Sequence, residues 1–259
     1  MKNKQMWSGV VIAVLVVIAL SACQSVQAAA SALVFVGESG STLIDEMALT
    51  ETLAETAVGT LTEDEAAGLM YMREEEKLAH DVYSVLYAKW QLPVFQNIAA
   101  SEQTHTEAVL GLLGRYGLSD PVTGRGVGEF ADPTLQSLYD QLVAQGSTSV
   151  EAALRVGTAI EEIDIMDLEE YLAQTDKVDI RRVYQNLLKG SRNHLRAFVR
   201  TLEQRTGITY VPQYMGAAAY EAIINSTTER GNAGSNEQGN GNRGGNGQTS
   251  SGRGNRGRP

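Results

Sequence analysis

The chain of 259 residues is long enough for one large or two small domains, and its single cysteine excludes an intramolecular disulfide and a thiolate metal site. The formal net charge of −10 is uneven: residues 1–60 contribute −3 and residues 226–259 contribute +3, so residues 61–225 carry −10 by themselves. An acidic globular domain argues against nucleic acid as its main partner and is compatible with cations as ligands.

The first residues have the features of a targeting segment. Lys2 and Lys4 form a basic start, and the apolar run over residues 10–20 is too short for a comfortable membrane span. The run ends in Leu20-Ser21-Ala22-Cys23, which resembles the lipobox of bacterial lipoproteins. In that family the peptide is cut before the cysteine and the thiol is acylated.

The lipobox predicts a signal peptide over residues 1–22 and a lipidated Cys23 that anchors the protein to a membrane in the cell envelope, outside the cytoplasm. The alternative is cleavage near residues 28–30 followed by secretion. Residues 24–60 are rich in Ala, Ser, Thr and Gly. We therefore expect residues 23–60 to form a flexible tether, with one short ordered piece at Leu33 to Val36.

A folded helical domain is predicted over residues 61–225. Thr62 and Glu65 have capping-box spacing at the start of the first long helix, which should run to Trp90. Glu76 falls in the one gap of its apolar stripe, at a position that should be buried. Of the neighbouring charges, Glu74 and Lys77 are predicted on the solvated face and Glu75 at its boundary.

The second long helix follows Pro93 and should end around Tyr116-Gly117. It contains Glu102 and His105, which lie three residues apart and therefore share one face of the helix. Two such side chains can hold a single metal ion, and a bound metal is one remedy for polar groups in a core. The alternative is a polar pair that faces a wet groove.

Residues 117–132 are rich in Gly and lack periodicity, which indicates a crossover loop. Asp132-Pro133 is a strong helix start, and we expect a short helix to Gln145 outside the main bundle. The third long helix should extend from Ser149 to Leu172. Its apolar stripe is interrupted at Glu161, and Asp164 follows three residues later, able to reach the same site.

A turn and cap over residues 176–179 should lead into the fourth long helix, which ends at Gln204. His194 lies on the core face of this helix, with Ser191 one turn before it. A lone core histidine is more often a packing residue than a ligand. Here it is the fourth polar break on four apolar stripes, and the coincidence indicates a shared site.

Four helices that offer Glu, Glu-x-x-His, Glu and His resemble the ferritin-like di-iron four-helix bundle, with rubrerythrin as the nearest comparison. In that family an Ala and a Tyr follow the first-helix Glu by three and seven residues, as Ala79 and Tyr83 do here. The resemblance implies an all-α ferritin-like bundle with an extra short helix in the crossover between helices 2 and 3. It also implies a set of metal ligands: Glu76, Glu102, His105, Glu161, Asp164 and His194.

Two sequence blocks, residues 71–79 and 193–198, also resemble a bacterial ferritin-like family of unknown function. That likeness covers roughly residues 61–220. It supports the fold and says little about a reaction.

The fourth helix departs from the ferritin-like pattern, because it reads Ser191-Arg192-Asn193-His194 where the family has Glu-x-x-His. A serine cannot bridge two metals as an anion. Three alternatives follow: Asp164 compensates, one position binds weakly, or only one metal is held. The remaining ligands suit iron or manganese better than a structural zinc ion.

Residues 226–259 contain Gly, Asn, Ser and Arg with almost no apolar side chains, and they should be disordered. Their arginines could touch anionic lipid, cell-wall polymer or nucleic acid, or only keep the protein soluble.

Two functional hypotheses remain. The first is an oxidoreductase that oxidises iron with oxygen or peroxide and depends on an outside electron donor. The second is a non-catalytic metal-binding or protein-interaction module with a degenerate di-iron site. The expected partners are the membrane, metal ions and, as one option, a second copy of the chain.

Overall fold

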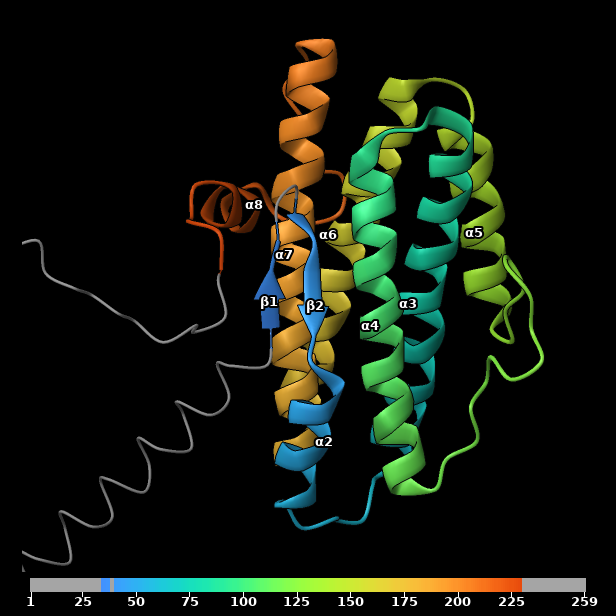
Figure 1. Cartoon of the computed structure of the whole chain (residues 1–259), viewed down its shortest axis with the longest axis vertical. Helices are drawn as coiled ribbons and strands as arrows, with labels where there is room; N and C mark the ends of the chain where they lie inside the picture. The colour runs from blue at the N-terminus through green and yellow to red at the C-terminus, as the bar shows by residue number, and fades with distance from the viewer. Residues whose placement is uncertain (1–33, 38–39, 230–259) are drawn as a thin grey trace, which may run out of the picture.

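The computed structural model describes residues 34–37 and 40–229 (Figure 1). Helices predominate in this part of the chain, and its strands form one short hairpin, which confirms the all-α class. Within the described ranges, none of the helices combines the length and apolar character needed to cross a membrane. The expected signal peptide, Cys23 and the tail from residue 230 onward lie outside the described residues.

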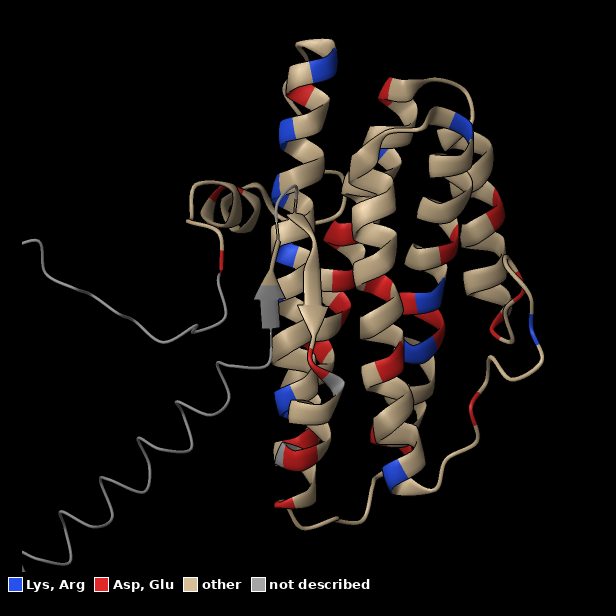
Figure 2. Cartoon of the chain, in the orientation of Figure 1, with Lys and Arg blue, Asp and Glu red and all other residues tan. Residues whose placement is uncertain are grey.

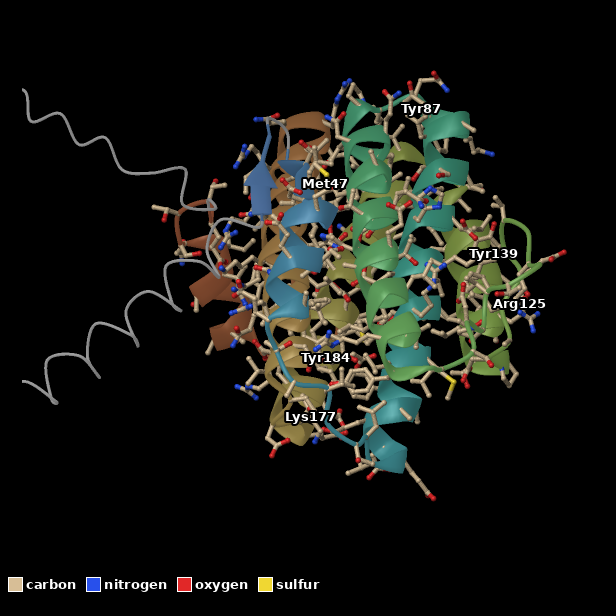
Figure 3. All side chains as sticks on the ribbon, turned by 60° about the horizontal axis from the view of Figure 1, so that its bottom comes forward. Met47, Tyr87, Arg125, Tyr139, Lys177 and Tyr184 are labelled. Carbon is tan, nitrogen blue, oxygen red and sulfur yellow. The ribbon has the colours of Figure 1, made fainter. Side chains whose placement is uncertain are left out.

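Four long helices form the body of the molecule: α3 (Glu63–Trp90), α4 (Pro93–Tyr116), α6 (Val150–Gln174) and α7 (Val178–Thr206). Helix α3 packs along α4 and α6 along α7, while α3 also contacts α6 and α4 contacts α7 (Figure 1). The rings of Tyr83, Phe95 and Phe198 pack together between them, with centroids 5.1 to 6.1 Å apart. In Figure 3, Tyr184 lies among the helices near the end of the bundle where Lys177 precedes α7.

Most helix ends follow their local sequence signals. The capping box of Thr62 and Glu65 forms at the start of α3, and Ser149 caps α6. Helix α4 ends at Gly117, whose φ of +68° is a conformation that glycine adopts at little cost. Helix α7 starts within the turn predicted over residues 176–179, with Lys177 at the N-cap position, but no side chain caps it. Asp179 lies inside the first turn, where it accepts hydrogen bonds from Arg115 and Tyr116 instead of capping the helix.

Helix α5 (Pro133–Gly146) starts at the predicted cap Asp132 and packs on α3 and α6 at the edge of the body (Figure 1). The crossover before it covers the face of α3 that we predicted to be solvated, and that prediction is wrong. Glu74 is 4% exposed and accepts hydrogen bonds from the backbone N–H groups of Ala131 and Asp132. Lys77 donates to the carbonyl oxygen of Gly126, 2.8 Å away.

The N-terminal segment is more ordered than the expected tether. Strands β1 (Val34–Val36) and β2 (Thr42–Ile44) form an antiparallel hairpin, and helix α2 (Glu46–Ala54) follows. Strand β2 packs on α4 and α7, and α2 packs on α4. Burial alternates along β2 as in a strand with one face on the core: Thr42 and Ile44 are buried, while Leu43 between them is 48% exposed. The amino-acid composition of residues 24–60 does not reveal this alternation.

The C-terminal part of the described chain crosses back over α6 and α7 and contains helix α8 (Ala217–Ile224). Buried Glu162 on α6 accepts hydrogen bonds from this segment. Glu229 pairs with Arg192 and Arg196, so residues 226–229 are held against α7 and the predicted disorder does not begin at residue 226.

Candidate metal centre

Five of the six predicted site residues converge from four helices at mid-length of the body. Acidic residues of α3, α4 and α6 lie at this level in Figure 2. The five side chains are each no more than 2% exposed, which places them in the core: Glu76, Glu102, His105, Glu161 and His194.

Glu102 lies at the centre of the arrangement. Its Oε2 is 2.8 Å from Nδ1 of His105, and its Oε1 is 2.8 Å from Nδ1 of His194. Oε2 of Glu76 lies 3.3 Å from Nδ1 of His105, and Oε2 of Glu161 lies 3.5 Å from Nδ1 of His194. The described residues therefore form two potential ligand groups, Glu76-Glu102-His105 and Glu102-Glu161-His194, that share Glu102.

The donor atoms fit metal ions. Neighbouring ligands on an octahedral ion with bonds of ~2.1 Å lie ~3 Å apart, close to the separations within each group. Nδ1 of His194 lies 2.8 Å from Oε1 of Glu102 without ideal hydrogen-bond geometry, and Oε1 of Glu76 has no hydrogen-bond partner among the described residues. A metal ion bound in this group would replace the proton on Nδ1 of His194.

Burial and mutual interactions shift the pKa values of the cluster in opposite directions. Burial raises the pKa of Glu76 to about 8 and also raises that of Glu161. Burial acts in the same sense on Glu102, but the two histidines outweigh it and lower the pKa of that carboxyl. Burial would lower the pKa of His194, but Glu102 and Glu161 raise it to about 9. Glu102 and Glu76 raise the pKa of His105 well above its usual value. In this way protons reduce the net negative charge of the buried carboxylates.

Asp164, the sixth predicted residue, lies beside the centre and belongs to neither ligand group. It is 5% exposed, and its Oδ1 has no hydrogen-bond partner among the described residues. The neighbouring hydroxyl of Ser191, which donates to the carbonyl oxygen of Leu187, favours the charged form of Asp164. Burial, together with the charges of Glu76, Glu161 and Glu102, raises its pKa well above the usual value. Asp164 thus stands next to the position where the ferritin-like pattern has a fourth-helix carboxylate.

Tyr83 fixes the orientation of Glu161. Its hydroxyl donates to Oε1 of Glu161 at 2.6 Å, which leaves Oε2 of the same carboxylate on the side of His194.

Sequence reasoning missed two residues at the centre. Thr42 on β2 lies with its hydroxyl oxygen 2.8 Å from Nε2 of His194 and 3.4 Å from Nε2 of His105. Gly190 on α7 faces the same place, because a Cβ there would lie 2.5 Å from Cε1 of His105. The sequence contained a signal for each residue. Strand-forming residues on both sides of Gly37 and Gly40 indicate the hairpin that carries Thr42. An isolated glycine inside a helical pattern, as Gly190 is, often has a packing or functional reason.

Comparisons with known proteins find one family and uncharacterized relatives. Residues 65–227 match the family described as an uncharacterized protein domain, DUF2202. The chain is 53% identical over 171 residues to the uncharacterized protein MJ0754 of Methanocaldococcus jannaschii, covering 66% of this chain and 92% of that protein. It is also similar to the crystal structure of hypothetical protein MJ0754 from Methanococcus jannaschii. That match has a TM-score of 0.65 and 50% identity and covers 67% of this chain and 99% of that one.

Proposed function

The chain belongs to the DUF2202 family of uncharacterized domains, and we propose that it is a metal-binding protein whose ferritin-like four-helix bundle holds two first-row transition-metal ions. The two ligand groups joined by Glu102 support two positions. Carboxylate oxygens and imidazole nitrogens without a thiolate favour iron or manganese.

One observation carries this proposal. The donor atoms of three buried carboxylates and two buried imidazoles form two groups, each within 4.8 Å, that share Glu102. Burying so many titratable groups together is costly without a compensating cation. An ion held by Glu102, Glu161 and His194, and a second held by Glu76, Glu102 and His105, would supply that cation.

Each side chain has a definite role in the proposed site. Glu76 and His105 would hold one ion, Glu161 and His194 would hold the other, and Glu102 belongs to both groups. Bound iron or manganese supplies one-electron chemistry toward oxygen or peroxide. Tyr83 keeps Glu161 oriented, and the closed helical packing excludes bulk water. An outside donor would provide the electrons for repeated turnover.

Ser191 supports a non-catalytic metal-binding module as the second candidate. It replaces the anionic ligand that the ferritin-like pattern has on the fourth helix, and its neighbour Asp164 lies outside both ligand groups. A site with one carboxylate fewer binds its ions with less charge compensation, which favours lower occupancy.

Metal content and thermal stability test the proposal. Wild-type protein purified without added metal should contain iron or manganese, and its melting temperature should rise with added metal, because an ion that binds only the folded state stabilises it. Glu102→Ala should abolish both effects. Glu107→Ala is the matched control, since Glu107 lies on the same helix and bonds only to Gln103 at the exposed surface. Identical melting of the wild type in chelator and in excess metal would contradict metal binding.

Ser191→Glu separates the two candidates. The new carboxylate adds an anionic ligand on the face that carries His194, so iron occupancy should rise above that of the wild type. Unchanged occupancy would mean that Asp164 already compensates or that a single ion is held. Oxidation of added ferrous iron by the wild type would favour the oxidoreductase, and bound but unreactive iron would favour the module.

The lipoprotein assignment is a separate proposal that rests on residues 20–23. If Cys23 is acylated, Cys23→Ala moves the protein from the membrane fraction to the soluble fraction. A membrane fraction that does not change would contradict the lipid anchor.

A further inference from the structure

The N-terminal hairpin reaches the candidate metal centre, although the family match begins only at residue 65. Thr42 is the residue of β2 that enters it. Its side chain is fully buried, and its hydroxyl lies between the Nε2 atoms of His194 and His105 at 2.8 and 3.4 Å. The opposite ring nitrogens, Nδ1, face the carboxylates.

The side chains that flank Glu102 hold the strand in this place. The backbone N–H of Thr42 donates to Oγ of Ser101 at 2.8 Å, and the N–H of Ile44 donates to Oγ1 of Thr104 at 3.3 Å. Two N–H groups of β2 are thus satisfied by hydroxyls of the helix that carries Glu102 and His105. This docking fixes the height of Thr42 above the two rings.

Gly190 on α7 makes the approach possible. A Cβ at this position would lie 2.6 Å from Nε2 of His105 and 2.9 Å from Oγ1 of Thr42. Helix α7 therefore has no side chain at the one point where the hydroxyl of β2 and the ring of α4 must meet.

The chemistry of the contact is specific. A threonine hydroxyl oxygen can accept two hydrogen bonds, and each neutral imidazole has one N–H and one lone pair. When Nε2 carries the hydrogen and donates to Thr42, the lone pair is on Nδ1 and points to the carboxylates. Partners on the second ring nitrogen are known to set the tautomer and the orientation of metal-binding histidines.

We propose that Thr42 is a positioning residue for the centre: its hydroxyl accepts hydrogen bonds from Nε2–H of both His194 and His105 and so presents both Nδ1 atoms to the metal ions. The inference rests on the proposed metal-binding function. It adds that the segment before the family domain completes the site.

Three variants of β2 test this role with manganese(II) as the probe. Thr42→Val removes the hydroxyl at nearly constant volume and should weaken manganese binding about 10- to 100-fold, as loss of such a partner typically does. Thr42→Ser keeps the hydroxyl and should stay within about threefold of the wild type. Leu43→Ala, on the exposed side of the same strand, is the matched control and should bind like the wild type. Manganese affinity is measured by chelator competition.

A second measurement is independent of metal affinity. Imidazole ¹⁵N–¹H correlation spectra of the full chain in chelator should show exchange-protected Nε2–H signals from two of the three histidines. Substitution of His80, which lies nearer the surface and pairs with Asp81, identifies the third. The protected signals should disappear in Thr42→Val and remain in Thr42→Ser.

The outcomes separate this inference from the proposed function. Protected Nε2–H signals in a wild type that binds no manganese would uphold the contact with Thr42 and contradict the metal site. The inference is overturned if those signals are missing in the wild type, or if folded Thr42→Val binds manganese as tightly as the wild type does. A variant that melts like the wild type in chelator but binds manganese weakly supports it.

Discussion

Glu161 and Glu162 are consecutive residues of α6 with 1% and 0% exposure, yet their surroundings are opposite in kind. The carboxylate of Glu162 accepts four hydrogen bonds from the C-terminal segment: from the hydroxyl of Tyr210 and from the backbone N–H groups of Gln213, Tyr214 and Met215, at 2.7 to 2.9 Å. Glu161 receives one hydroxyl, from Tyr83, and its other oxygen faces His194.

The comparison shows why burial by itself does not identify a metal ligand. A buried carboxylate must have a partner, and the number of protein donors around it tells whether the protein is that partner. By this criterion Glu162 anchors the chain and Glu161 has capacity left for an ion. The 100° turn between neighbours on a helix is enough to assign the two roles.

The largest expected effect is the loss of the Glu162 anchor. Glu162→Ala leaves the buried hydroxyl of Tyr210 and the buried N–H of Met215 unpaired and removes two part-buried hydrogen bonds. Since each hydrogen bond to a charged group is worth about 1.5–3 kcal/mol, the free energy of unfolding should fall by about 4 kcal/mol. Glu161→Ala, measured in chelator, should change it by less than about 1 kcal/mol because it also relieves repulsion within the cluster. Urea denaturation of both variants measures the free energy of unfolding. Equal losses of stability in the two variants would contradict the different roles of Glu162 and Glu161.

An intermediate effect is expected from pH. A metal ion must displace the protons that His194 and Glu76 retain up to pKa values of about 9 and 8. Both groups are therefore more protonated as pH falls, and metal binding should weaken on acidification and strengthen toward pH 8. We expect manganese affinity to rise about tenfold or more per pH unit between pH 6 and 8, by chelator competition at each pH. A manganese affinity that does not change with pH would contradict a site in which the ion displaces protons from Glu161 and its neighbours.

The smallest expected effects on stability come from replacing a glycine of a long helix by alanine, either beside the centre or far from it. Alanine normally stabilises a helix by ~1 kcal/mol relative to glycine, and Gly111→Ala on α4 should do so because a Cβ there meets nothing within 4 Å. Gly190→Ala should destabilise by a similar amount, because it pushes against His105 and Thr42. Melting temperatures that shift in opposite directions confirm the contrast, and a stabilised Gly190→Ala would contradict it.

The helices and the convergence of the five side chains could be predicted because local sequence determines them. Helix starts depend on residues such as Thr62 and Asp132 within one turn, and a polar residue in an apolar stripe must face the interior. Glu76, Glu102, His105, Glu161 and His194 each interrupt such a stripe. Their spacing therefore predicted, for each helix, that the polar residue lies on the face that packs against the other helices.

The remaining features depend on partners that are distant in the sequence. Glu74 looks like a surface residue until the crossover, 57 positions later, covers it with the N–H of Ala131. The donors for Glu162 come from residues about 50 positions away. Thr42 belongs to a segment of tether-like composition, and only the packing of β2 on α4 and α7 reveals its role. Composition and periodicity contain no information on such contacts.

The 152 positions between Thr42 and His194 also have a consequence in time. Ribosomes extend a chain at about 5–20 residues per second, so on the order of 10 s pass between the synthesis of these two residues. Late in that interval the nascent chain contains Glu76, Glu102, His105 and Glu161 but not yet His194. The centre is therefore complete only when α7 has been synthesised and the first and last parts of the domain meet.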